Sequence, residues 1–131
     1  MIKFGYTILY VEDVEEAIAF YENAFGFTRK FVSPDNDYGE LLTGETTLSF
    51  ASKKLAAQNL PDGFLESNLE DKPFAIEIGL ITEDVPETLQ KATSFGAVIV
   101  SEPHEKPWGQ IVAYARDLNG FLIEICTQVK A

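Results

Sequence analysis

The segment TILYVEDVEEAIAFYENAFGF, residues 7–27, decides the fold, because residues 77–97, EIGLITEDVPETLQKATSFGA, repeat its pattern. Each copy contains an alternating apolar run, an acidic pair, a helix-like stretch and a closing Phe-Gly pair, and Asp13 in the first copy corresponds to Asp84 in the second. The chain therefore reads as two copies of one module that starts with a strand and a helix. Such modules are expected to pack around a pseudo-twofold axis, with a ligand cleft built from both copies.

The pattern continues beyond the repeat in the same order in both modules. Apolar alternation over residues 4–11 predicts a strand, Asp13 and Glu16 can form a capping box, and Gly26 can end the helix in the left-handed conformation. Turn-forming residues separate the remaining strands, so that each module reads βαβββ. The expected strands are 4–11, 27–32, 38–42 and 46–51, then 75–81, 98–100, 110–115 and 121–127; the expected helices are 13–26 and 84–96, with a short one at 55–59.

Length and composition limit the domain organisation. A chain of 131 residues, 46% of them hydrophobic, can bury one good core, which favours a single domain, 1–131, made of two half-domain modules. Module one spans 1–51, a polar linker spans 52–73, and module two spans 74–131. The sequence leaves open whether the modules pair within one chain or exchange between chains, and what the linker does.

Charge and cysteine content exclude several classes of protein. The formal net charge of −11 repels phosphate backbones and anionic lipid, so nucleic acid and membrane surfaces are not expected partners. Cys126 stands alone, which excludes an intrachain disulfide. No run of about 18 apolar residues is present to span a bilayer. The first residues enter a strand pattern without an apolar leader, and we expect a cytoplasmic protein.

The motifs that carry the strongest resemblance are FYENAFGF and the closing ARDLNGFLIEI, which contains a D-x-N-G-x-x-x-E pattern at Asp117, Asn119, Gly120 and Glu124. With the two βαβββ modules, they resemble the vicinal oxygen chelate superfamily, which includes glyoxalase I, bleomycin-resistance proteins and extradiol dioxygenases. The resemblance covers essentially the whole chain. It implies an α+β fold in which two βαβββ modules form an eight-stranded incomplete barrel or cleft with helices outside, and a homodimer. A shared fold does not fix the chemistry.

The resemblance also implies positions for site residues. In metal-dependent members the ligands come from the first and last strand of each module. Matching the motifs places Tyr6 and Glu77 where relatives carry His, and places Ser49 and Glu124 where relatives carry Glu. Of the four positions, only position 124 carries the residue that is usual in the relatives, a glutamate.

The spacing of the chain supports this matching independently. Tyr6 and Glu77 are 71 residues apart, as are Asp13 and Asp84. Strand alternation also places Glu77 and Glu124 on the cleft face of their strands, away from the helix layer. Two carboxylates are therefore expected to face one cavity.

The histidine count limits the possible metal chemistry. The single histidine, His104, lies in SEPHEKP and is expected in a solvated turn, so a two-His iron site cannot form within one chain. We expect no cofactor and no tightly bound metal; a weakly held divalent ion would use Glu77 and Glu124. Without metal, Glu124 is the candidate base and Glu77 its partner. Alternatively both carboxylates only shape the cleft, paired with Tyr6, Ser49 or Arg116.

Aromatic residues predict a wall for a small ligand. In KPWGQIVAYARD, Trp108 lies in the loop that leads into a strand, and Tyr114 and Arg116 share one face of that strand. Three tyrosines are expected on the opposite side: Tyr6, Tyr10 and Tyr38. An acidic, aromatic pocket suits a flat ligand that is cationic or rich in hydrogen-bonding groups. Trp108 would equally suit a dimer contact.

Two functions compete at this point. The first is a metal-independent protein of the glyoxalase and bleomycin-resistance type that binds a small planar organic molecule. The second is a lyase or isomerase that removes a proton next to a carbonyl, with Glu124 as the base. The inward carboxylates disfavour a third reading, an interaction module without a ligand. The identity of the ligand is open.

Overall fold

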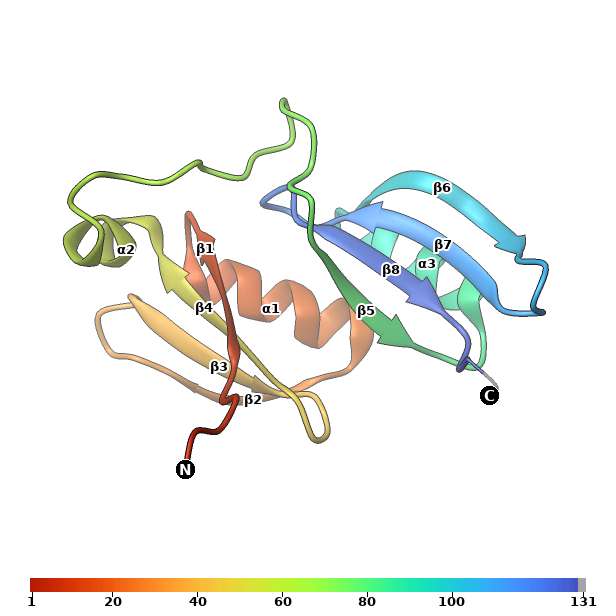
Figure 1. Ribbon diagram of the computed structural model, residues 1–131, viewed down its shortest axis with the longest axis horizontal. Helices are drawn as coiled ribbons and strands as arrows, with labels where there is room; N and C mark the ends of the chain where they lie inside the picture. The colour runs from red at the N-terminus through yellow and green to blue at the C-terminus, as the bar shows by residue number, and fades with distance from the viewer. Residues whose placement is uncertain (130–131) are drawn as a thin grey trace. The chain divides into compact units, whose positions relative to one another are not determined.

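The computed structural model describes residues 1–129 of the chain, which divides into two compact units, Met1–Glu66 and Ser67–Ala131 (Figure 1). Each unit holds one four-stranded sheet with a helix packed on it. The boundary between the units falls inside the expected linker, 52–73. The organisation as one domain stays a prediction.

Unit one follows the expected order of elements. These are β1 (Thr7–Val11), α1 (Val14–Phe25), β2 (Thr28–Val32), β3 (Tyr38–Leu42), β4 (Thr47–Ser52) and α2 (Lys53–Asn59). The sheet has the order β1-β4-β3-β2, in which β1 and β4 are parallel and the other neighbours antiparallel. The short helix expected in the linker is present and begins two residues earlier than predicted.

Unit two repeats this arrangement. Its elements are β5 (Glu77–Ile81), α3 (Val85–Ser94), β6 (Val98–Glu105), β7 (Ile111–Arg116) and β8 (Leu122–Cys126), in the sheet order β5-β8-β7-β6. The prediction of an α+β fold with two βαβββ modules is confirmed, with the eight strands in two four-stranded sheets that are not closed into a barrel. No helix within residues 1–129 is long and apolar enough to cross a membrane.

The length of β6 differs from the prediction, which ended this strand at residue 100. The strand continues to Glu105, so His104 lies opposite Val112 in the sheet and not in a turn. β6 is an edge strand with irregular pairing between Ser101 and His104. An edge strand tolerates Pro103, because a proline there removes no obligatory bond of the ladder.

Each sheet buries one face against the helix of its own unit. In unit one, Leu9, Val11 and Phe50 are buried on the side of α1, together with Ile18 and Tyr21 of the helix. Burying a side chain of this size contributes roughly 1.5–3 kcal/mol. Because side chains alternate along a strand, their sequence neighbours point to the other face, which we call the helix-distal face.

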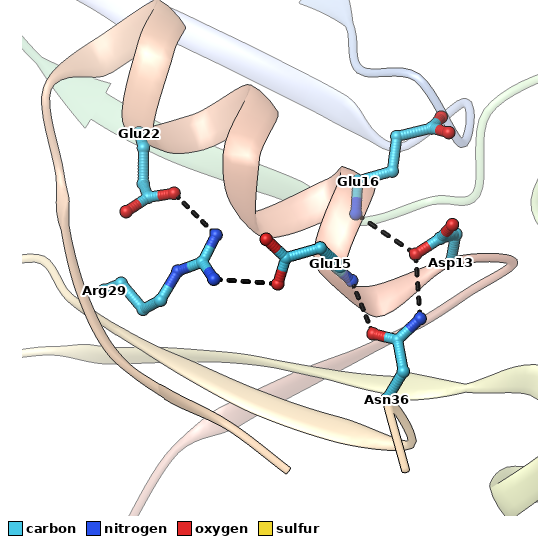
Figure 2. Close-up of polar contacts among 6 residues, drawn as sticks. All are labelled: Asp13, Glu15, Glu16, Glu22, Arg29 and Asn36. Carbon is cyan, nitrogen blue, oxygen red and sulfur yellow. Dashed lines mark hydrogen bonds and ion pairs between the residues drawn. The ribbon is translucent and has the colours of Figure 1, made fainter. Parts of the chain in front are cut away.

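A small polar network fixes the start of α1 (Figure 2). Asp13 Oδ1 accepts a hydrogen bond from the backbone N of Glu16 at 3.2 Å, which confirms the cap on the Asp13 side. Asn36, in the turn between β2 and β3 with φ 61°, accepts from the backbone N of Glu15 at 2.8 Å and donates to Asp13 at 3.0 Å. The turn thereby satisfies a second free N–H group of the helix.

An arginine ties β2 to the same helix. Arg29 Nη1 donates to Glu15 at 2.7 Å, and its Nη2 donates to Glu22 at 2.9 Å (Figure 2). The two carboxylates stand seven residues apart, two turns along α1, so one guanidinium bridges both. Arg29 therefore belongs to the helix side of the sheet.

The closing motif forms the turn between β7 and β8. Asp117 Oδ1 accepts from the backbone N of Asn119 and of Phe121, each at 2.9 Å. Gly120 has φ 86°, and a Cβ there would overlap the carbonyl of Asn68. Glycine is required because of both the backbone conformation and the close approach of the chain.

We expect Asn36→Ala to lower the free energy of unfolding by about 1–2 kcal/mol, because it removes two capping bonds and places alanine in a left-handed conformation. Denaturant unfolding of the full chain measures this loss. Asn23→Ala, at an exposed position of α1, is the control and should change stability by less than about 0.5 kcal/mol. Equal effects of the two variants would show that Asn36 does not stabilise the helix start.

Candidate functional site

Strand register brings two carboxylates and a phenol onto the helix-distal face of unit two. Glu124 of β8 lies between Gly79 of β5 and Tyr114 of β7. Glu77 lies two residues before Gly79 on β5, opposite Leu122. The Tyr114 hydroxyl donates to Glu124 Oε1 at 3.0 Å. Glu77, Glu124 and Tyr114, all predicted from the sequence, are therefore neighbours within one unit.

Burial, together with the charges on this face, shifts several pKa values. Burial, followed by the nearby charge of Glu124, raises the pKa of Glu77 above its usual value. Burial first, and then the hydrogen bond to Glu124, raises the pKa of Tyr114 to about 12. Tyr114 therefore stays protonated at neutral pH and remains a hydrogen-bond donor. Burial also raises the pKa of the Cys126 thiol to about 11, which disfavours a reactive thiolate.

This donor set does not fit a tightly held transition metal within unit two. Two carboxylates and a phenol include no imidazole, whereas zinc and nickel sites favour nitrogen or sulfur ligands. Within residues 1–129, no group of three or more His, Cys, Asp and Glu side chains is arranged to hold a metal ion. Glu124 and Glu77 themselves offer hydrogen bonding and proton transfer on this face.

The helix-distal face of unit one carries a second polar group. Ser49 of β4 lies opposite Ile8 of β1 and Glu40 of β3 in the sheet. Glu40 accepts a hydrogen bond from the Tyr38 hydroxyl at 2.7 Å, and the Lys30 ammonium lies 3.5 Å from its other oxygen. Sequence reasoning missed Glu40 and Lys30. The signal for Glu40 was available, since it follows Tyr38 by two residues and so shares its face.

Burial dominates the electrostatics of Tyr38. It raises the pKa of this phenol; the nearby Ser49 hydroxyl acts in the opposite direction, and the charge of Glu40 adds to the increase. The charge of Tyr6 also raises the pKa of Tyr38. Tyr6 was expected within the first strand, but it lies just before β1 and is exposed. Tyr10 is half-buried, and its ring contacts Phe64 edge-on at a centroid distance of 5.0 Å.

Trp108 lines a pocket of about 750 Å³ in unit two. The pocket lies at the ends of β5, β7 and β8, beside the turn that joins β6 to β7, and its lining includes Ile81, Glu83, Gln110, Ile111 and Thr127. The indole Nε1 donates to Gln110 Oε1 at 2.8 Å, and Gln110 Nε2 donates to the Thr127 carbonyl at 3.0 Å. The indole is thus held at its nitrogen while 64% of the residue stays exposed.

The predicted site residues of unit two do not all lie at the Trp108 pocket. Glu77, Glu124 and Tyr114 do not line the Trp108 pocket. Arg116 is buried and donates to three carbonyls, those of Gly120, Asp71 and Asn68, at 2.8–3.0 Å. A ligand would have to displace one of these bonds to reach the guanidinium. Ligand binding by each of these residues stays a prediction.

A comparison with models of protein families identifies the family of this chain. The family model for the Glyoxalase/Bleomycin resistance protein/Dioxygenase superfamily matches residues 3–125. No curated protein sequence matches the chain.

Solved structures share the fold at low sequence identity. A glyoxalase-related enzyme from Fulvimarina pelagi is 15% identical with a TM-score of 0.81, over 98% of this chain and 89% of that one. A glyoxalase/bleomycin resistance protein/dioxygenase family enzyme from Burkholderia phytofirmans PsJN is 23% identical, with a TM-score of 0.77 and coverage of 96% and 98%. A hypothetical protein from S. aureus is 28% identical, with a TM-score of 0.77 and coverage of 98% and 95%.

We expect Glu124→Gln to lower the pKa of Tyr114 from about 12 toward the ordinary tyrosine value, and to lower the pKa of Glu77, because the charge of Glu124 raises both. Site-resolved NMR titration of the phenol and carboxyl carbons measures the two shifts. Glu40→Gln is the matched control, since it removes a carboxylate that is bonded to Tyr38. Unchanged titration of Tyr114 in Glu124→Gln would mean that the two side chains do not interact in solution.

Proposed function

The chain belongs to the glyoxalase/bleomycin resistance protein/dioxygenase superfamily, and we propose that it binds a small planar organic ligand in the pocket beside Trp108, without a tightly held metal. The observation that carries this proposal is the exposed indole, fixed at its nitrogen by Gln110, in the wall of a pocket of about 750 Å³. Pockets for small molecules measure roughly 300–1,000 Å³ and combine apolar walls with a few polar groups.

The lining of the pocket favours a flat ligand with donors or a positive charge. The indole offers a face for stacking, and Ile81 and Ile111 add apolar surface. Glu83 provides a carboxylate, while Gln110 and Thr127 provide polar groups next to it. The net charge of −11 draws cations toward the protein. A planar aromatic amine satisfies each of these features.

Trp108 is the single tryptophan of the chain, so its fluorescence reports on this pocket alone. We expect 4-aminoquinoline, which is planar and cationic at neutral pH, to quench this emission with saturation, and cyclohexylamine to have little effect. Calorimetry gives the affinity without relying on the indole. Trp108→Leu should weaken binding about tenfold, because an aromatic contact contributes about 0.5–1.5 kcal/mol beyond the area that it buries.

Two controls make this test decisive. Glu124→Gln should leave the affinity for 4-aminoquinoline unchanged, because Glu124 lies outside the pocket lining. Equal affinity for the planar and the non-planar amine, or full affinity in Trp108→Leu, would reject stacking on the indole and with it the proposed ligand class.

A second candidate function rests on the hydrogen bond between Tyr114 and Glu124. A carboxylate held by a phenol on the helix-distal sheet face can take a proton from a carbon next to a carbonyl, which describes a lyase or an isomerase. Glu124 would be the base, Tyr114 would hold its orientation, and Glu77 would take part through its raised pKa. This function predicts that turnover is lost in Glu124→Gln while ligand affinity is retained, whereas a binding protein shows no turnover to lose.

The proposal includes a homodimer, as the resemblance to this superfamily implies. It also includes a cytoplasmic location, which the lone Cys126 favours. Sedimentation velocity of the purified chain at micromolar concentration tests the assembly. A mass of one chain at all concentrations would contradict it.

A further inference from the structure

The indole of Trp108 is held by the amide of a neighbouring side chain, Gln110. The indole Nε1 donates to Gln110 Oε1 at 2.8 Å, and Gln110 Nε2 donates to the Thr127 carbonyl at 3.0 Å. One amide thereby links the turn between β6 and β7 to the residue that follows β8. A flipped amide would place its own N–H group against the indole N–H. The two bonds together therefore fix the direction of the amide as well as that of the indole.

Gln110 is buried, although the side chain that it holds is exposed. Gln110 is 8% exposed, whereas Trp108 is 64% exposed. A buried amide needs hydrogen-bond partners, because removing it from water costs free energy that only new hydrogen bonds offset. The amide therefore does not leave its two partners freely. It anchors the nitrogen side of the indole within the protein, while the ring itself stays available at the pocket.

The turn between β6 and β7 fixes the backbone of Trp108 separately. The backbone N of Gly109 donates to the Lys106 carbonyl at 2.8 Å, and the backbone N of Lys106 donates to the Gln110 carbonyl at 2.8 Å. Pro107 stands at the second position of this four-residue turn, where proline is favoured, and Gly109 has φ 93°. With the backbone fixed, the two side-chain torsions of the tryptophan remain free to vary. The bond to Gln110 selects one combination of them.

The duplicated module offers an internal comparison for this amide. In unit one, the backbone N of Ser52 donates to the Asp37 carbonyl at 2.8 Å. In unit two, the backbone N of Thr127 donates to the Ile111 carbonyl at 3.0 Å, and both bonds connect the end of the last strand to the start of the strand before it. The residues just before Asp37 and Ile111 therefore occupy corresponding positions.

The corresponding residues are Asn36 and Gln110, two side-chain amides with different partners. Asn36 bonds to Asp13 and to a backbone N–H group at the start of α1, so it caps that helix. The start of α3 is capped by Asp84, while the Gln110 amide bonds to the indole and to a carbonyl. The module therefore does not require an amide bonded to an indole, and this bond is particular to unit two.

We propose that Gln110 is the positioning residue of the Trp108 pocket, and that the preference of this pocket for planar ligands depends on it. The inference rests on the proposed function, since it concerns how the same pocket binds its ligand. Gln110 acts through the indole, which it presents in one orientation before the ligand arrives. An indole that must first be ordered by the ligand weakens binding several-fold, because ordering a side chain costs conformational entropy.

The bond to Gln110 also limits what the indole offers to a ligand. An indole has one N–H donor and no acceptor, and Gln110 uses that donor. The ligand therefore meets the ring and not the N–H group of Trp108. Polar groups of the ligand bind to other residues of the lining, among which Glu83 carries a negative charge. Stacking thus depends on the orientation of the ring, which Gln110 sets.

The first test needs no ligand. Time-resolved fluorescence anisotropy of the full chain follows Trp108 alone, because it is the single tryptophan. We expect the wild-type indole to rotate with the protein, and Gln110→Met to add a fast rotation, because methionine has a similar length and no amide. Gln90→Met, at an exposed position of α3, is the control and should keep the wild-type decay. Fast rotation already in the wild type, or an unchanged decay in Gln110→Met, would overturn the proposal.

The second test measures binding by calorimetry in the same variants. Gln110→Met should weaken the binding of 4-aminoquinoline about fivefold without changing that of cyclohexylamine, because only the planar amine uses the oriented ring. Added to Trp108→Leu, the same change should have no further effect, since Gln110 acts through the indole. Further weakening in the double variant, or full affinity in Gln110→Met, would contradict the positioning role.

A third variant covers the case in which Gln110→Met does not fold. In Gln110→Glu at about pH 4, the protonated carboxyl group accepts from the indole and donates to the Thr127 carbonyl, as the amide does. The wild-type anisotropy decay is therefore expected in this variant at that pH, and fast rotation in a chain that is folded by circular dichroism would reject the proposal.

The two tests also separate this inference from the proposed function. A wild-type chain that binds no 4-aminoquinoline rejects the proposed ligand class. The anisotropy of the free protein still decides whether Gln110 holds the indole, since that measurement involves no ligand.

Discussion

The parallel pairing of the first and last strand in each unit is the constraint on which the other features depend. β1 pairs with β4, and β5 with β8, at one end of each four-stranded sheet, and α1 or α3 covers one face of that sheet. Burial of Phe50 and Ile125 on the helix side fixes the register, because a slip of one residue would turn every side chain to the opposite face. The same register holds Ser49 and Glu124 on the helix-distal faces.

The two units use one backbone for different chemistry. Glu40 lies opposite Ser49 in unit one, and Tyr114 lies opposite Glu124 in unit two, at corresponding positions of the paired strands. Each unit thus has a carboxylate that accepts from a tyrosine, but the carboxylate stands on β3 in the first and on β8 in the second. A duplicated module can diverge in this way because an exchange on the helix-distal face leaves the helix-side core intact.

Local sequence patterns predict the helices and strands well, and the contacts between residues distant in the chain less well. The Asp13 cap could be read from residues three apart, whereas the role of Asn36 depends on a turn that returns to the helix from 23 residues away. His104 was assigned to a turn because of its neighbouring prolines, but pairing with β7 extends the edge strand through it. Glu40 is not selected from the sequence, because the family pattern directs attention to the first and last strands, nor is Lys30, because an edge bulge cannot be read from the sequence.

The sequence by itself determined the duplicated βαβββ order, the membership in a superfamily and the face on which Glu77 and Glu124 lie, because side-chain direction follows from period-two alternation along a single strand. The tertiary structure alone decided which side chains meet. It joined Tyr114 to Glu124 and Tyr38 to Glu40, and it placed Trp108 in a pocket whose lining does not include Glu77 or Glu124. Such contacts depend on the register between strands distant in the chain, which packing of the whole core selects.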